Sequence, residues 1–115
     1  MISLIRNLIR SWTNITTNPI IHSVIFSLKH EKGSAEEHRF LEDGRSALST
    51  IPTVQAFKVF KQISPKNTYD FGFSMVFDNE ADYEAYNVHP QHVDFVENRW
   101  KKEVEQFLEI DYSEV

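Results

Sequence analysis

The sequence predicts an α+β protein with the ferredoxin-like order β-α-β-β-α-β, in which four antiparallel strands form one sheet. Three observations lead to this fold class. Apolar residues alternate with period two in the strand segments, they follow helical spacing in the segments between, and polar or proline-containing turns separate the two kinds. At 115 residues, with nine Phe, four Tyr and two Trp, the chain fits one domain with a real core.

Residues 1–19 stand apart from this domain, which we assign to residues 20–115. Polar residues interrupt their apolar run and no small-residue cleavage site follows, so they do not fit a secretory signal. A transmembrane helix needs about 20 predominantly apolar residues, and this segment does not supply them. We expect an amphipathic helix that docks on the domain or on a partner subunit, followed by a polar linker ending at Pro19. A membrane-surface helix, or a start upstream of the true domain, are the alternatives. The residues near one helical face are Ile2, Ile5, Ile9 and Trp12.

The first strand and the first helix follow this linker. IIHSVIFSLK, residues 20–29, alternates with period two and is rich in β-branched residues, which predicts a strand covered on both faces. Ser34 is a good N-cap, and Glu37 three residues later completes a capping box. Apolar residues at helical spacing then predict a helix that Pro52 closes.

Two further strands come next. TVQAFKVFKQI, residues 53–63, and YDFGFSMVFD, residues 69–78, flank the polar turn SPKNT. In the second of these strands, bulky side chains occupy one side and small ones occupy most of the other. The bulky side consists of Tyr69, Phe71, Phe73, Met75 and Phe77.

The second helical region is interrupted near its middle. Asn79 is the predicted N-cap. Pro90 disfavours the helical conformation at His89, so we expect a break or bend there. A final strand is predicted over FLEIDY, residues 107–112. The helical run after the break carries Val93, Val96, Trp100 and Val104.

A sheet with helices on one side has a second face to cover. Here that face carries apolar residues such as Ile21, Ile25 and Val76. An exposed apolar patch usually marks a binding surface, and twofold homodimers are the commonest oligomers. The sequence therefore predicts a homodimer in which two sheets pack face to face.

Composition excludes several classes of function. The net charge of −5 and the pI near 5.5 argue against a nucleic-acid partner, because phosphate binding needs a basic patch. The chain has no cysteine, which excludes disulfides, thiolate metal sites and a Cys nucleophile, and is compatible with a cytoplasmic location. With three glycines and no phosphate-cradling loop or dinucleotide fingerprint, we expect no cofactor.

Five segments of the chain match one known family pattern: IIHSVIFSLK, IPTV, TYDFGFSMVFDNEADYEAY, HPQHVDFV and FLEIDY. With these segments, the chain from Ile20 to Tyr112 resembles the stress-responsive A/B barrel domain, also called the Dabb or dimeric α+β barrel family. The resemblance implies a homodimer whose two sheets close into a barrel with the helices outside. Thr53 stands where the family usually has the Gly of I-P-G-V, and residues 1–19 have no counterpart in short members.

The resemblance implies an activity only through one member. Most members have no established reaction, and some plant members look like stress-stability proteins that form higher oligomers. One plant member is a polyketide cyclase that uses a His as base and a Tyr as its partner. In this sequence Tyr86 and His92 match that pair, and His22 matches a further pocket histidine. Phe71 replaces another pocket histidine of the cyclase.

The segment HPQH, residues 89–92, therefore has three interpretations. The histidine spacing could serve a metal ion, but Pro90 disturbs it and zinc needs a further ligand, so we expect no metal site. In a structural interpretation, His89 ends one helix, Pro90 begins the next, and His92 packs or hydrogen-bonds at its start. In an acid–base interpretation, His92 is a general base and Tyr86 a proton donor.

A ligand pocket between sheet and helices is expected around this pair. An aromatic residue on a strand face is more often part of the core than of a pocket wall. For the aromatic residues of this set, a place in the core is therefore the alternative. The expected pocket residues are His22, Phe26, Phe71, Phe73, Trp100 and His89.

Two functions of different class follow. The first is a small homodimer that binds a hydrophobic or aromatic small molecule, with cofactor-free cyclase- or lyase-type chemistry at His92 and Tyr86. The second is a non-enzymatic stress-response or assembly module, which the doubly apolar sheet and the extension over residues 1–19 favour.

Overall fold

The computed structural model describes residues 18–115 and confirms the predicted α+β class. The amphipathic helix expected within residues 1–19 falls almost wholly outside the described residues. Between 18 and 115, no helix is long and apolar enough to cross a membrane. The elements are β1 (Ile20–Leu28), α1 (Ala35–Ser49), β2 (Gln55–Lys61), β3 (Phe71–Phe77), α2 (Glu80–Asn87), α3 (Pro90–Phe95), the π-helical turn η1 (Val96–Trp100), α4 (Lys101–Glu103) and β4 (Val104–Ser113).

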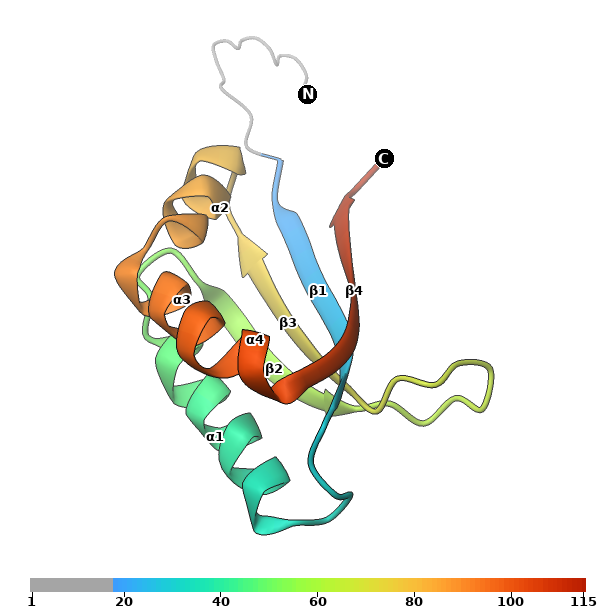
Figure 1. Cartoon of the computed structure of the whole chain (residues 1–115). Helices are drawn as coiled ribbons and strands as arrows, with labels where there is room; N and C mark the ends of the chain where they lie inside the picture. The colour runs from blue at the N-terminus through green and yellow to red at the C-terminus, as the bar shows by residue number, and fades with distance from the viewer. Residues whose placement is uncertain (1–17) are drawn as a thin grey trace, which may run out of the picture.

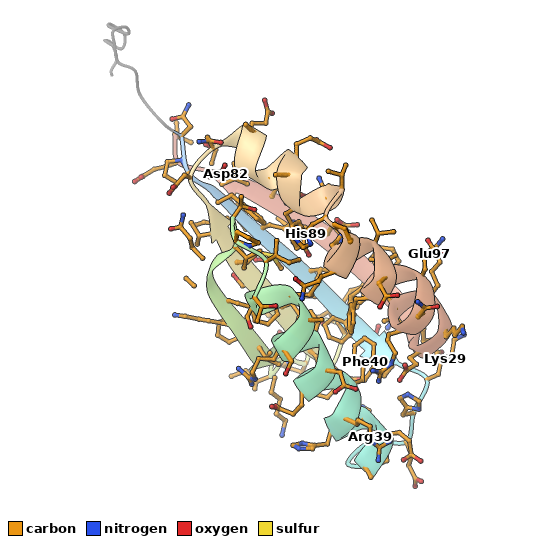
Figure 2. The ribbon with its side chains drawn as sticks, turned by 90° about the vertical axis from the view of Figure 1, so that its left-hand side faces the viewer. Lys29, Arg39, Phe40, Asp82, His89 and Glu97 are labelled. Carbon is orange, nitrogen blue, oxygen red and sulfur yellow. The ribbon has the colours of Figure 1, made fainter. Side chains whose placement is uncertain are left out.

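One antiparallel sheet with the strand order β2-β3-β1-β4 forms the frame of the molecule. The helices lie together on one face of this sheet, as two views at right angles show (Figures 1 and 2). In the register, His22 of the central strand β1 lies between Met75 of β3 and Asp111 of β4. Even-numbered residues of β1 therefore face the helices, and odd-numbered residues face away.

Aromatic side chains fill the space between the sheet and α1. Phe26 on β1, Phe73 on β3 and Phe40 on α1 are at most 1% exposed. Phe26 and Phe73 pack edge to face with ring centroids 4.8 Å apart. Gly44 lets α1 approach closely, since a Cβ there would lie only 2.7 Å from the Phe73 ring. The predicted helix thus packs closest to the sheet at its one glycine.

The region after the predicted break differs from a single helical run. The break at His89 is confirmed, but the helix beyond it passes through the π-turn η1 and ends at Glu103. Val104, which helical spacing assigned to this helix, is instead the first residue of β4 and has extended backbone. The backbone N–H of Lys29 donates to the carbonyl of Glu103 at 2.8 Å, which joins the end of α4 to the sheet. The final strand therefore starts three residues earlier than predicted.

The start of β4 is also held by a polar cluster that the sequence did not reveal. His30 donates to Glu103 at 2.7 Å, and Arg99 of η1 donates to the other oxygen of the same carboxylate at 2.5 Å. A second nitrogen of Arg99 donates to Asp43 on α1 at 2.5 Å. Burial opposes ionisation of Glu103, but these hydrogen bonds outweigh it and hold the pKa of its carboxyl below the ordinary value.

The face of the sheet away from the helices is apolar and open in the single chain. Of the residues predicted on this face, Ile21 is 44% exposed, and Ile25 and Val76 are half-buried. The structure adds Leu108 at 47% and Tyr112 at 55% on the neighbouring strand β4. The edge strand β2 adds Phe60, half exposed. Ile21, Phe60, Leu108 and Tyr112 are called the outer patch below.

Edge strand β2 is shorter than predicted and irregular. It covers Gln55–Lys61 rather than residues 53–63, and its register with β3 shifts between Gln55 and Lys58. Ala56 in this bulge has a positive φ of 51°, which costs a non-glycine residue conformational energy. Bulges of this kind twist an edge strand and discourage further strand pairing.

We predict that Asn79→Ala lowers the free energy of unfolding by about 1 kcal/mol. The Asn79 side chain accepts a hydrogen bond from the backbone N–H of Asp82 at 2.8 Å and so caps α2. Asn79→Asp is the matched control, because its carboxylate can accept the same bond. Chemical denaturation measures both variants, and an equal loss in both would rule out the cap as the cause.

Candidate functional site

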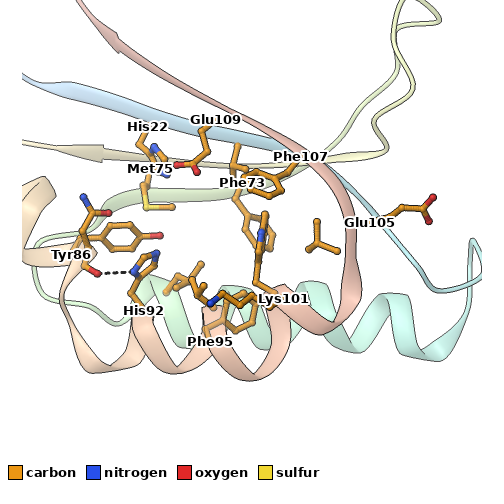
Figure 3. Close-up of a pocket in the computed structure, with 16 residues that line it drawn as sticks. His22, Phe73, Met75, Tyr86, His92, Phe95, Lys101, Glu105, Phe107 and Glu109 are labelled. Carbon is orange, nitrogen blue, oxygen red and sulfur yellow. Dashed lines mark hydrogen bonds between the residues drawn. The ribbon is translucent and has the colours of Figure 1, made fainter.

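A cavity of about 540 Å³ lies between the sheet and the helical layer. Its size falls in the range of small-molecule sites, and a mainly apolar wall with a few polar groups is typical of them. Strands β1, β3 and β4 form one wall, and the segment from α2 to α4 forms the other (Figure 3). The apolar lining residues are Val24, Leu48, Phe73, Met75, Phe95, Val96, Trp100, Val104 and Phe107.

His92 projects into this cavity from the first turn of α3. Its Nδ1 lies 3.0 Å from the backbone carbonyl of Asn87, which can only accept, so Nδ1 carries the proton (dashed in Figure 3). The other ring nitrogen, Nε2, is then bare in the neutral ring and able to accept a proton. Burial lowers the pKa of His92, which favours this neutral form.

Tyr86 lies against His92 near the end of α2. The two ring centroids are 4.3 Å apart, and Tyr86 is only 3% exposed. Figure 3 shows its hydroxyl pointing into the cavity. Burial, aided by nearby negative charge such as Glu109, raises the pKa of Tyr86, so the phenol stays protonated and remains a hydrogen-bond donor.

His22 faces the cavity from the opposite wall, on β1. It is 5% exposed, and its Nδ1 lies 2.5 Å from Oδ1 of Asp111 on β4. The Tyr83 hydroxyl donates to Oδ2 of the same carboxylate at 3.0 Å and lies 3.1 Å from the His22 Nδ1. Burial, with the hydrogen bond to Asp111, raises the pKa of Tyr83 and keeps it protonated. These contacts fix the orientation of the His22 ring, with its Nδ1 edge facing Asp111.

Five residues named from the sequence meet at this cavity. They are the catalytic candidates Tyr86 and His92 and the pocket candidates His22, Phe73 and Trp100. The η1 turn contributes Trp100, and π-helical turns occur often at functional sites. Helical and strand periodicity could place each residue on an inward face, and the structure brings them together.

Three other predicted pocket residues lie outside the cavity lining. Phe26 is fully buried in the core between Phe40 and Trp100, where no ligand reaches it. Phe71 packs on Phe26, with the two ring centroids 6.0 Å apart. His89 sits at the junction of α2 and α3, where its side chain accepts from the backbone N–H of Gln91 and caps α3 (Figure 2). For these three, core packing and capping describe the observed contacts.

Sequence reasoning missed Asp111, Tyr83 and Glu109. Alternation in the last strand places Glu109 and Asp111 on one face, so an inward polar pair was visible there in principle. Only the register of β4 against β1, which sets Asp111 opposite His22, reveals the contact. Tyr83 lies one helical turn before Tyr86, and its part in the contacts around His22 follows from the packing of α2 on the sheet.

Metal ligands do not cluster in the described part of the chain. No group of three or more His, Asp or Glu that could hold a metal ion occurs in residues 18–115. His89 and His92, three residues apart, turn to different backbone partners. The metal interpretation of HPQH therefore has no third ligand among these residues.

The family model for the stress-responsive A/B barrel domain, Dabb, matches residues 20–114. The chain belongs to this family. A Dabb family protein of Mesorhizobium loti with a ferredoxin-like fold is 53% identical, with 85% of this chain and 98% of that chain covered and a TM-score of 0.85. None of the curated proteins matches this chain.

More distant structures share the fold of this Dabb domain. A hypothetical protein of Arabidopsis thaliana is 27% identical, with 91% of this chain and 96% of that chain covered and a TM-score of 0.69. A hydroxynitrile lyase of Passiflora edulis is 14% identical, with 84% of this chain and 94% of that chain covered and a TM-score of 0.73. At that identity the likeness to the lyase concerns the fold alone.

For the Dabb chain we predict that His92 titrates below 6.5, its ordinary pKa. Between the folded and the unfolded pKa, the unfolded chain binds more protons at this residue, so stability falls as the pH drops through this window. Ring-proton NMR measures the pKa directly. The free energy of unfolding, measured at about pH 7.5 and at about pH 5.5, gives the pH dependence of stability. Between these two pH values, His92→Gln should lose less stability than wild type. A measured pKa above the ordinary value would contradict the burial argument.

Proposed function

We propose that this Dabb protein binds a small, mainly apolar carbonyl compound in its cavity and acts on it by cofactor-free acid–base chemistry. The observation that carries the proposal is the hydrogen bond between His92 Nδ1 and the Asn87 carbonyl, which leaves Nε2 as a proton acceptor beside a protonated Tyr86. A neutral imidazole can serve as the base and a phenol as the hydrogen-bond donor for enolisation of a carbonyl compound.

The proposed step is a proton transfer from a carbon next to the carbonyl group. His92 Nε2 accepts this proton and becomes imidazolium, and the electron pair of the C–H bond moves into an enolate. The Tyr86 hydroxyl donates a hydrogen bond to the enolate oxygen as negative charge develops there. The enolate then attacks a second carbonyl in the same molecule or expels a leaving group, and imidazolium returns the proton.

The comparisons support this class of chemistry only by analogy. A protein of the same fold is a hydroxynitrile lyase, so a lyase reaction occurs on this architecture. The mainly apolar lining here favours an aromatic or aliphatic compound over a highly polar one. A cytoplasmic location, compatible with the absence of cysteine, belongs to the same proposal.

We also propose that the protein is a homodimer through the outer patch, with the two sheets closing into a barrel. Ile21, Leu108 and Tyr112 expose large apolar surface on adjacent strands, and burial of such surface is the main favourable term in association. Similar ferredoxin-like proteins from Bacteroides fragilis and Thermobifida fusca are dimeric. Assembly through this patch is also what the non-enzymatic alternative requires.

We predict that His92→Ala lowers turnover of β-keto or polyketide-like substrates by about 10²–10⁴-fold, the usual contribution of a positioned base. Tyr86→Phe should lower turnover by about 10²–10³-fold, because it removes one donor to the developing oxyanion. His38→Ala is the matched control, since His38 lies exposed on α1. Steady-state kinetics measures all three, and unchanged turnover in both site variants would remove the proposed pair.

We predict that wild-type protein is a dimer at micromolar concentration and that Leu108→Lys shifts it toward monomer. The introduced ammonium would have to be buried between two apolar sheets, which is costly. Val93→Lys on α3 is the control, because Val93 is 45% exposed, close to the 47% of Leu108, but lies on the helical side. Light scattering measures the mass; a monomeric wild type would contradict the barrel.

A further inference from the structure

The wall of the cavity opposite His92 holds a second, independently oriented imidazole. We infer that Asp111 and Tyr83 are positioning residues that hold His22 with a bare Nε2 toward the cavity, so that the bound molecule presents a hydroxyl group there. This inference rests on the proposed function, because it names the class of ligand for the same cavity: a hydroxy-carbonyl compound.

The tautomer of His22 follows from its partner. A carboxylate accepts hydrogen bonds and cannot donate, so the 2.5 Å contact with Asp111 Oδ1 requires the proton of the neutral ring on Nδ1. Nε2 on the other edge of the ring then has no proton. Because His22 is a cavity-lining residue and 95% of its surface is covered, its remaining polar atom has little access to bulk water.

Tyr83 keeps the carboxylate in this orientation. Its hydroxyl donates to Asp111 Oδ2 at 3.0 Å, so the two carboxylate oxygens have different donors and the group is held at both ends. The Tyr83 ring also packs 5.1 Å from the His22 ring, which limits rotation of the imidazole. Asp111 is 44% exposed, so its charge is partly hydrated while it fixes His22.

The two walls thus offer complementary groups to one ligand. Tyr86 is a donor and suits a carbonyl oxygen. His22 is an acceptor at Nε2 and suits a hydroxyl group. Figure 3 shows His22 on the strand wall and Tyr86 on the helical wall, and their ring centroids are 6.1 Å apart. A ligand whose carbonyl and hydroxyl groups lie close together on an apolar body would satisfy both, whereas a ligand with two acceptors would leave Nε2 unpaired.

The test reads the proton on His22 directly. Nitrogen-detected NMR at about pH 9, where an ordinary imidazole is neutral, should show Nδ1 protonated and Nε2 bare in wild type. Asp111→Asn should invert this tautomer, because its amide group can donate to Nδ1 and the proton then moves to Nε2. Asp78→Asn, an exposed carboxylate at the end of β3, is the control and should leave the signals unchanged.

Binding of two probes tests the ligand class. Phenol, which can donate to Nε2, should bind wild type about five-fold more tightly than anisole, its methyl ether. Asp111→Asn should abolish that preference, and Asp78→Asn should keep it. Tyr83→Phe should weaken the preference without inverting the tautomer, since Asp111 remains.

Either of two results overturns the inference. One is a wild-type His22 with a proton on Nε2 at about pH 9, whether as the other tautomer or as imidazolium; this result does not depend on the folding of any variant. The other is equal binding of phenol and anisole by wild type. Both are independent of turnover, so loss of the acid–base proposal through an active His92→Ala variant would leave the tautomer result standing.

Discussion

The alternation of side chains along β1 is the constraint on which the other features depend. β1 is a central strand, hydrogen-bonded to β3 on one edge and to β4 on the other. Its side chains alternate between the two faces of the sheet, so even-numbered residues meet the helices and odd-numbered residues meet none of them. The first face builds the core at Phe26 and the cavity at Val24 and His22. The second face leaves Ile21 exposed, and from this our homodimer proposal follows. A shift of one residue in register would exchange both surfaces at once.

Backbone and carboxylate acceptors decide what the histidines can do. The Asn87 carbonyl takes the Nδ1 proton of His92, and Asp111 takes that of His22, so both rings turn Nε2 toward the same apolar volume. His30 and His89 make structural contacts instead: His30 hydrogen-bonds to Glu103, and His89 caps the start of α3. Identical side chains therefore differ in role through the single partner that each one meets.

Sequence reasoning reached the fold because periodicity, caps and prolines act locally. The caps Ser34 and Asn79 and the break at Pro90 were all visible, and each is confirmed. It failed where contacts between distant segments decide. Val104 is extended rather than helical because the carbonyl of Glu103 accepts a hydrogen bond from Lys29, which is distant in the sequence. The Asp111–His22 contact depends on the strand register. Phe26 shows the remaining difficulty, since one inward face contains both core and cavity lining and periodicity cannot separate them.

The central claim is that one face of the sheet serves a ligand and the other serves a second copy of the chain. Methyl NMR on a refolded mixture of labelled and unlabelled protein, with acetophenone as the probe ligand, tests both halves in one sample. The account predicts intermolecular contacts to the methyl groups of Ile21, Ile25 and Leu108, and acetophenone-induced shifts at Val24, Leu48 and Met75. Acetophenone shifts confined to the first set, or an absence of intermolecular contacts, would contradict it.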